Sequence, residues 1–404
     1  MDTFHPKKDN FIVRIPPYIL SIIIFSQFCG TALWFATNGI LTQLISVFQL
    51  EENELGNLTS AVQLGFIIGT LVFAIFTISD RFSPSKVFLG CAMLGAFLNL
   101  ATLWEGNILT SLLLIRFLVG FFLAGIYPVG MKIAADYFKK SLGISLSFLV
   151  AALVLGTAFP HLLVTFFSET SWKIITICIS IIAMLGGLCI GFLVPNGPYR
   201  EAAQKLKLSA FIHVFKNKKF RHAAVGYFGH MWELYAFWAF IPVFLATYDL
   251  QNPETAINSS LWTFLIIAAG SLGCILGGFL SARKGIKKVA YASLCISGVL
   301  CLASPLLFEL PPFLFLGILM LWGMVVIADS PLFSTLVANN ATPTIKGTAL
   351  TIVNCMGFAI TIISIQLLSF LSTAIPIPYL FMILAIGPFL GIYKYFKIEV
   401  LGYS

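Results

Sequence analysis

Twelve long apolar segments, joined by short polar connections, constrain the fold of this chain more than any other feature. Each contains about 20 residues, the length that an α-helix needs to cross the ~30 Å hydrocarbon core of a bilayer. Such runs are too long and too uniformly apolar for the strands of a membrane β-barrel. The sequence therefore predicts an all-α polytopic membrane protein. The segments are 17–41, 59–79, 87–104, 109–136, 142–167, 172–194, 223–247, 258–280, 288–308, 312–337, 346–371 and 377–396.

The composition leads to the same fold class. Of the 404 residues, 59% are hydrophobic and only 10% are charged, so a soluble protein of this length would have too little polar surface to cover itself. The sequence contains no nucleotide-binding P-loop motif, no metal-ligand motif and no recognisable hydrolytic triad. We therefore expect a protein that is not an enzyme, that holds no metal or cofactor, and that draws energy from a gradient.

Basic residues are distributed unevenly among the connections. When the N-terminus is placed in the cytoplasm, the cytoplasmic connections hold nearly all of the lysines and arginines, and the opposite connections hold Lys173 alone. This distribution follows the positive-inside rule and predicts an inner-membrane protein with both termini in the cytoplasm. The net charge of +8 then orients the chain in lipid and does not indicate a nucleic-acid partner.

The chain divides into two halves with internal similarity. The polar, lysine-rich stretch at 198–221 separates them, which predicts an N-terminal bundle (1–197), a cytoplasmic linker and a C-terminal bundle (222–404). With an offset near 202, "GFIIG" in the second segment matches "GCILG" in the eighth, and Pro128 matches Pro331. Small residues spaced in this way let membrane helices approach closely. We expect two pseudo-symmetric six-helix bundles around a central pathway.

Two motifs resemble those of the major facilitator superfamily. The loop after the second segment keeps Asp80, Arg81 and Lys86 of the family pattern G-x-x-x-D-R-x-G-R-R-K but departs from it at other positions, and the fourth segment carries "RFLVG", which matches R-x-x-x-G. The resemblance covers essentially the whole chain and leaves the subgroup open. It implies a secondary transporter, usually monomeric, whose first, fourth, seventh and tenth spans face a central cavity.

The resemblance also implies a gate on the cytoplasmic side. Asp80 and Arg81 would pair with the ends of the spans, including Asp136, and stabilise one conformation. The alternative is that these charges only orient the protein. Lys132 and Asp136, four residues apart on one helix face, could form a structural pair.

Several polar and aromatic residues are candidates for the wall of the cavity. In the first segment Gln27, Thr31, Trp34 and Asn38 recur at the spacing of one helix face, and the alternative is that they bind neighbouring helices. Arg116 is interpreted either as an attraction point for substrate or as a brace between helices. The other candidates are Tyr127, Tyr227, Phe237 and Asn354.

Three ionisable residues are candidates for proton coupling. Counted along the seventh segment, His230 lies about 10 Å deep and Glu233 about 15 Å deep, near the bilayer centre. Burial disfavours the charged form of a carboxyl group and of an imidazole, so both can exchange protons near neutral pH. We expect Glu233 to be the main proton site, His230 to tune it, and Asp329 in the tenth segment to be a counter-group. The alternative is a structural pair between Glu233 and His230 or Arg116.

The sequence therefore predicts a transporter that moves a small solute by alternating access, with protons as the coupling ion and membrane lipid as its surroundings. One alternative is a uniporter or exchanger of a small anion, anchored by Arg116. Another is a membrane sensor or scaffold that does not transport. The substrate and the direction of transport stay open.

Overall fold

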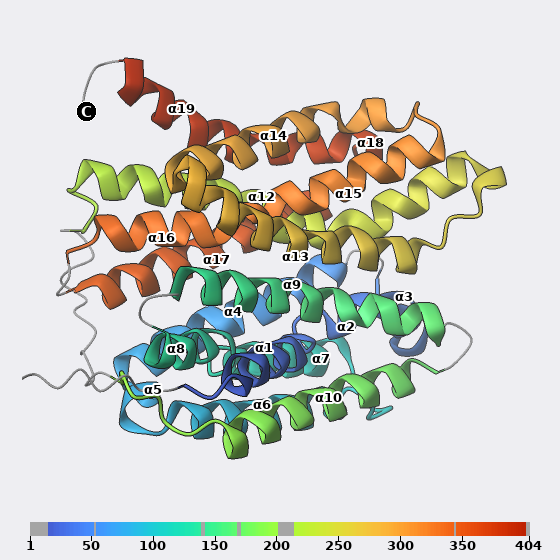
Figure 1. Ribbon diagram of the computed structural model, residues 1–404. Helices are drawn as coiled ribbons and strands as arrows, with labels where there is room; N and C mark the ends of the chain where they lie inside the picture. Colours follow the sequence, from blue (N-terminus) through green and yellow to red (C-terminus); the bar gives the residue numbers. More distant parts are fainter. Residues whose placement is uncertain are drawn as a thin grey trace, which may run out of the picture.

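The computed structural model describes residues 15–51, 54–138, 142–167, 171–200, 214–342 and 345–400, without the side chains of 394–400. Within these ranges ten helices are long and apolar enough to cross a membrane, and two shorter apolar helices complete the set (Figure 1). This confirms the all-α class and the twelve spans. Of the predicted linker at 198–221, residues 201–213 lie outside the described ranges.

Ten of the twelve spans consist of a long helix or of two helices joined end to end. Nine of these lie before residue 346 of the chain. They are α4 (Glu54–Ile75), α6 (Pro84–Ala101), α7 (Leu109–Leu123) with α8 (Tyr127–Tyr137), α9 (Leu142–Phe166), α10 (Trp172–Leu193), α12 (Lys218–Gln251), α13 (Ser259–Lys284), α14 (Ile286–Leu307) and α15 (Pro312–Ala328) with α16 (Ser330–Asn340).

The remaining spans and the short connecting helices complete the chain. They are α1 (Tyr18–Thr31), α2 (Ala36–Gly39), α3 (Leu41–Phe48), α5 (Ile78–Arg81), the 3-10 helix η1 (Pro253–Thr255), α17 (Lys346–Leu371), α18 (Ile377–Leu380), the 3-10 helix η3 (Phe381–Ala385) and α19 (Ile386–Val400).

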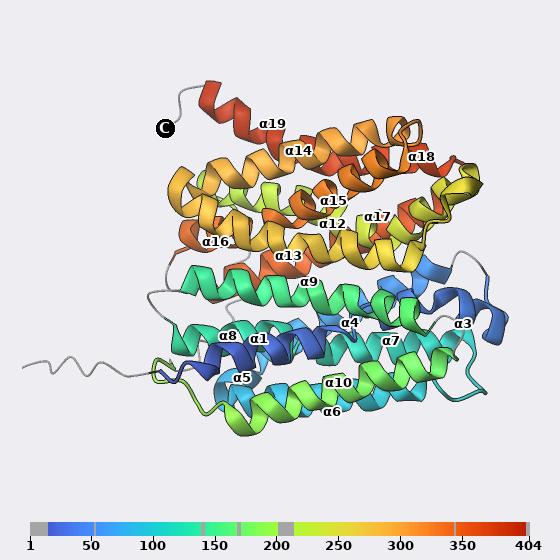
Figure 2. The ribbon, with the colours of Figure 1, turned by 45° about the vertical axis from the view of Figure 1, so that its right-hand side comes forward.

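The helices gather in two groups. In both views α1–α10 lie together on one side and α12–α19 on the other (Figures 1 and 2). The groups meet mainly where α9 packs against α13 and α4 packs against α17. Four helices, two from each half, therefore form most of the contact between the groups.

Glycines allow two pairs of helices to touch along their backbones. A Cβ added to Gly65 would lie 1.8 Å from a carbonyl oxygen of α7, and one added to Gly120 would lie 2.0 Å from a carbonyl oxygen of α4. In the second half, a Cβ on Gly273 or Gly323 would lie 2.0 Å from a carbonyl oxygen of the facing helix. The close approach expected for the two matching glycine motifs is therefore present between equivalent helices of the two halves.

Five of the predicted spans are not one continuous α-helix. In 17–41, 109–136 and 312–337 the chain leaves α-helical geometry after Thr31, Leu123 and Ala328; in addition, 59–79 is interrupted after Ile75 and 377–396 passes through the 3-10 helix η3. Pro128 and Pro331 stand in the first turn of the helices that follow the second and third breaks. Proline fits there because the first turn of a helix leaves its N–H groups without helical acceptors. The first break has no proline.

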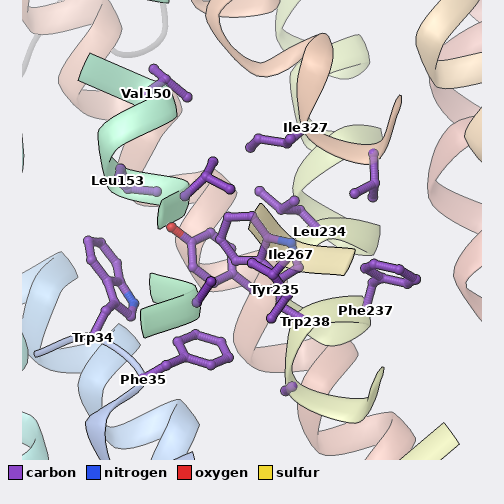
Figure 3. Packing of buried hydrophobic residues seen from close by; sticks show 14 of the residues in the cluster. Trp34, Phe35, Val150, Leu153, Leu234, Tyr235, Phe237, Trp238, Ile267 and Ile327 are labelled. Carbon is purple, nitrogen blue, oxygen red and sulfur yellow. The ribbon is translucent and has the colours of Figure 1, made fainter. Parts of the chain in front are cut away.

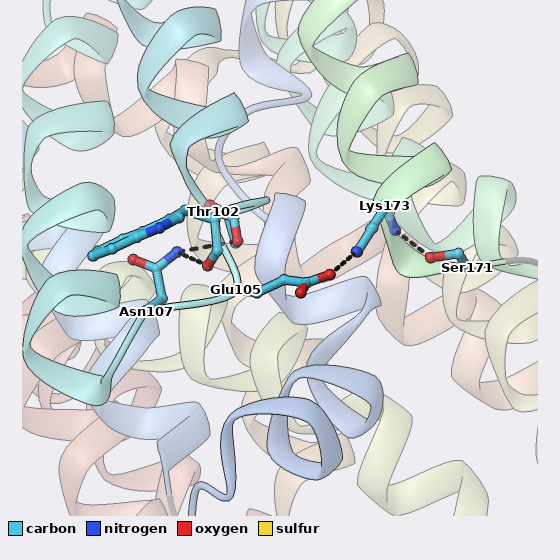
Figure 4. A network of polar contacts seen from close by, with 6 residues as sticks. Thr102, Glu105, Asn107, Ser171 and Lys173 are labelled. Carbon is cyan, nitrogen blue, oxygen red and sulfur yellow. Dashed lines mark hydrogen bonds and ion pairs between the residues drawn. The ribbon is translucent and has the colours of Figure 1, made fainter.

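The single lysine expected on the non-cytoplasmic side has an acidic partner. Its Nζ lies 2.5 Å from an Oε1 of Glu105, so Lys173 joins the connection after α6 to the start of α10 (Figure 4). The hydrogen bond from Lys173, together with its positive charge, lowers the pKa of Glu105 below its ordinary value. Within the same connection, the amide of Asn107 donates to the carbonyl oxygen of Thr102 over 3.2 Å.

Candidate functional site

A cavity of about 720 Å³ lies between the two groups of helices. Its wall comes from α4, α8 and α9 in the first half and from α12, α16 and α17 in the second. It extends to the helix ends that carry Asp80, Lys132 and Lys346. In Figure 1 these ends lie on the left, on the same side as the C-terminus.

Packed aromatic rings fill the space beyond the other end of the cavity. Trp34 stacks on Phe358 at a centroid distance of 5.6 Å. Trp34 also lies 5.8 Å from Tyr235, and Phe35 lies 6.3 Å from Trp238 (Figure 3). The rings of Trp34, Phe35 and Trp238 are fully buried. Because rings from both halves interlock here, this group, which we call the aromatic floor, closes the cavity opposite its open side.

Three of the residues predicted to line a cavity do so. Tyr127 enters from α8, and Tyr227 and Asn354 enter from α12 and α17. The hydroxyl of Tyr227 donates to Oδ1 of Asn354 over 3.1 Å. These side chains lie toward the floor, and Tyr127 lies 6.4 Å from Trp34 between ring centroids.

The four residues of the first segment lie outside this cavity wall. The hydroxyl of Thr31 donates to the carbonyl oxygen of Gln27 over 2.8 Å, and the amide of Asn38 donates to Thr59 on α4 over 2.9 Å. Because the helix ends at Thr31, the expected continuous stripe does not exist. In this conformation Gln27, Thr31 and Asn38 are buried or half-buried among helices, and Trp34 belongs to the floor.

Arg116 contacts the interrupted part of the first span. Its side chain is 1% exposed, and Nη2 donates to the carbonyl oxygens of Leu33 over 3.1 Å and of Trp34 over 2.5 Å. Neither carbonyl oxygen accepts a backbone hydrogen bond from the described residues, because the helix does not continue past Thr31. Nη2 of Arg116 takes the place of the missing helical N–H donors. This contact corresponds to the brace between helices, and Arg116 is not among the residues that line the cavity.

Phe237 also lies away from the cavity wall. Its ring packs 4.8 Å from that of Trp322 and 5.9 Å from that of Phe381, so it belongs to the core of the second half.

Glu233 is buried among neutral donors of the second half. It is 1% exposed, and its Oε1 accepts from the Ser297 hydroxyl, from Nε1 of Trp322 over 2.9 Å and from Sγ of Cys301 over 3.3 Å. Serine and cysteine come from α14, and the tryptophan comes from α15. Sequence reasoning missed these partners, since none carries a charge that would mark it.

His230 and Asp329 form a second buried pair. Nδ1 of the imidazole lies 2.7 Å from Oδ1 of the carboxyl group, and both side chains are 1% exposed. Asp329 stands at the break between α15 and α16. The expectation of a counter-group in the tenth span thus has a geometric basis, although the contact is made to His230. Both residues are one layer behind the cavity wall, next to its members Tyr227 and Ser330.

The predicted gate residues lie at the open side of the cavity. Nζ of Lys132 lies 2.7 Å from Oδ1 of Asp80 and 3.9 Å from Oδ1 of Asp136, so the lysine joins the two acids that we expected to act together. Arg200, after the sixth span, donates to the carbonyl oxygen of Asp80 over 2.6 Å. Arg81 is exposed.

Solved structures share this arrangement of helices. A bacterial homolog of the human lysosomal transporter Spinster, in an inward-facing and unoccupied conformation, matches with 14% identity and a TM-score of 0.68, over 94% of this chain and 97% of that chain. The proton:xylose symporter XylE matches with 14% identity and a TM-score of 0.71, over 95% of both chains. The fucose:proton symporter FucP of E. coli matches with 19% identity and a TM-score of 0.63, over 95% of this chain and 99% of that chain.

The family comparison covers most of the sequence. No curated protein sequence matches this chain significantly. The family model of the Major Facilitator Superfamily matches residues 23–365. This match agrees with the helical architecture and with the two motifs after the second span and in the fourth. The chain belongs to the major facilitator superfamily and is a multi-pass integral membrane protein of the transporter type.

Proposed function

We propose that this protein is a secondary active transporter that moves a small solute across the inner membrane by alternating access. The observation that carries the proposal is the cavity between the two halves, which reaches the helix ends on one side and meets the aromatic floor on the other. Rocking the halves about this cavity would open the floor and close the gate side. A scaffold would not require a cavity of about 720 Å³ inside its membrane region.

The open side of the cavity is the cytoplasmic side in this proposal. The distribution of lysine and arginine supports this orientation, with both termini in the cytoplasm. The two units that move are 1–197 and 222–404, joined by the linker at 198–221, and one copy of the chain suffices because the cavity is built within it.

Protons are the coupling ion that we propose, and the buried acids carry them. Ionisable residues inside a membrane are costly and mark proton or substrate pathways by default. The His230–Asp329 pair, on the seventh and tenth spans, lies next to the cavity wall, and Glu233 is buried on the seventh span against α14 and α15. Two of the similar structures, XylE and FucP, are described as proton symporters. Their names support proton coupling and do not identify a substrate here.

The geometry suggests how a proton could be linked to movement. Asp329 sits where the tenth span changes from α15 to α16, and its carboxyl group contacts an imidazole of the seventh span. Protonation of the Asp329 carboxylate would remove its negative charge and so loosen its contact with His230, between two spans that border the cavity. Glu233 lies about one turn further along α12. It would gain or lose a proton while the three neutral groups that donate to it change position.

The anion alternative has weaker support. Its anchor, Arg116, donates to two backbone carbonyls and does not line the cavity. We therefore retain proton-coupled transport as the single proposed function.

Transport by the purified protein in liposomes tests the proposal. A panel of small organic solutes would be supplied with and without an imposed pH gradient. We expect at least one solute to accumulate only when the gradient is present. Equal accumulation with and without the gradient for every transported solute would contradict proton coupling.

A further inference from the structure

The chemistry of the cavity wall changes between its two ends. The charged residues of the wall are Asp80, Lys132 and Lys346. The first two neutralise each other over 2.7 Å. Lys346 begins α17, and Asn354 lies about 12 Å further along that helix at about 1.5 Å per residue. The part of the wall near the aromatic floor therefore has no charged side chain among the described residues.

Arg116, His230, Glu233 and Asp329 lie behind this wall, and none of them lines the cavity. The Arg116 guanidinium donates to backbone carbonyls, and the Glu233 carboxyl group accepts from three neutral donors. His230 and Asp329 contact each other. A charged solute near the floor would lose part of its hydration without meeting a counter-charge on the cavity wall, which is unfavourable. The site therefore favours a solute without charge.

The floor end offers flat rings and a few neutral polar groups. Tyr127, Tyr227, Tyr235 and Phe358 present aromatic side chains to the cavity, and rings of this kind bind other rings by offset stacking and edge contacts. Within the described part of the chain, no protein hydrogen bond is made by the hydroxyl of Tyr127 or of Tyr235, and both residues line the cavity. Such hydroxyls can donate to acceptors on a solute.

We propose that the substrate is an uncharged aromatic or heteroaromatic molecule with hydrogen-bond acceptors at its edge, held between Tyr127 on one half and Tyr235 on the other. This inference rests on the proposed transport function and names the solute class for the same cavity. A polyol would need more directional partners than these hydroxyls and the amide of Asn354 provide. Contact with both halves would let the solute influence their movement.

Binding of three probes of nearly equal shape tests the charge requirement. Naphthalene-2-carboxamide is neutral, naphthalene-2-carboxylate is an anion, and 2-naphthylmethylammonium is a cation. Equilibrium dialysis against the full-length protein in detergent, corrected with empty micelles, gives their affinities. We expect the amide to bind roughly tenfold or more tightly than either charged probe. Tighter binding of a charged probe, or no binding of the amide at millimolar concentration, would overturn the proposal.

Two variants locate the bound probe. Tyr127→Phe and Tyr235→Phe remove one hydroxyl each and keep the ring, so each should weaken amide binding about threefold to tenfold. Tyr379→Phe is the matched control, since Tyr379 is 53% exposed on α18 and does not line the cavity. Unchanged affinity in both cavity variants, or tighter binding of D-glucose than of the amide, would count against the proposed site.

The binding assay separates this inference from proton coupling. Dialysis at equilibrium uses no gradient, so a failure of coupling leaves the affinities unaffected. Conversely, gradient-driven uptake of an anion or a sugar would support the transport function and refute the proposed solute class.

Discussion

At the scale of single residues, Arg116 illustrates how a buried charge can be used for structure. Its guanidinium satisfies the carbonyls of Leu33 and Trp34, where the first span is interrupted. Charge-assisted hydrogen bonds of this kind are the strong ones, and removing the donor leaves buried acceptors without partners. The burial of Arg116 inside the membrane is therefore explained by the interruption of the first span, whose free carbonyl oxygens need a donor.

Arg116→Met should destabilise the protein by roughly 2–4 kcal/mol, because it keeps the apolar stem and removes the donors. Thermal unfolding in detergent would measure this loss. Exchange of solute between equal pools, scaled to the folded fraction, should stay close to that of the wild type. Normal stability with abolished exchange would instead identify Arg116 as a substrate anchor.

Asp80→Asn should weaken transport about fivefold with little change in thermal stability. The Asp80–Lys132 pair is about a fifth exposed, with side chains 21% and 23% exposed, so it contributes only ~0–1 kcal/mol to folding. A difference of that size between two conformations is enough to change their populations several-fold. Initial uptake rates in liposomes, at matched protein amounts, provide the measurement.

Asp80→Glu provides the control for this pair. It keeps a carboxylate beside Lys132, leaves the contact of that lysine with Asp136 in place, and should retain most of the uptake. If Asp80→Asn transports at the wild-type rate, the gating role of this acid is wrong.

At the scale of helices, the contacts between α4 and α7 and between α13 and α15 decide how the halves are built. Each depends on glycines that bring one backbone against another. An added methyl group there must displace backbone, whereas a lipid-facing glycine accepts it freely.

Gly323→Ala should lower the stability of the protein by about 1–3 kcal/mol, because the new Cβ would lie 2.0 Å from a carbonyl oxygen of α13. Gly317→Ala on the same helix is the matched control, since a Cβ there would meet no atom within 4 Å. Melting temperatures of the two variants in one detergent compare them directly. Equal melting temperatures would show that the close helix contact does not stabilise the fold.

The sequence predicted the elements better than their interruptions. Apolar length was sufficient to find twelve spans, and Pro128 and Pro331 stand beside two of the breaks. The break in the first span carries no proline, and it is stabilised by an arginine 82 residues or more away. Local patterns do not contain that information.

The candidate site was predictable in part: Tyr127, Tyr227 and Asn354 line the cavity as expected, and charge marks the buried ionisable residues. Glu233, His230 and Asp329 stood out as ionisable groups in apolar segments, but the donors Ser297, Cys301 and Trp322 did not, because serine, cysteine and tryptophan are ordinary in a membrane core. Which residues face the cavity depends on the rotation of each helix about its axis. That rotation is set by packing between helices, which no single segment reveals.

At the scale of the whole molecule, the orientation in the membrane rests on the charges of the connections. Lys207 lies in the linker, outside the residues that the structure describes. A cysteine at this position, with the eight native cysteines replaced, should be shielded from an impermeant maleimide in intact cells. A cysteine at Glu254, in the connection after α12, should react. The reverse labelling pattern would overturn the proposed topology.

The cavity and the buried acids lie in one membrane region, so the central claim is that proton movement through the acids drives solute movement through the cavity. Glu233 and Asp329 are the groups to alter, since each is a carboxyl group 1% exposed inside the membrane region and Asp329 adjoins Ser330 of the cavity wall. Glu254→Gln, in the connection after α12, is a matched control that should behave as the wild type.

The most direct test compares two assays of Glu233→Gln and Asp329→Asn in liposomes, using a solute that the wild type accumulates. An amide keeps the size of the carboxyl group but cannot exchange a proton at neutral pH. We predict that both variants fail to accumulate the solute against its gradient when a pH gradient is imposed, while exchange between equal pools continues at a measurable rate. Accumulation by both variants at the wild-type level would show that these carboxyl groups only brace the helices.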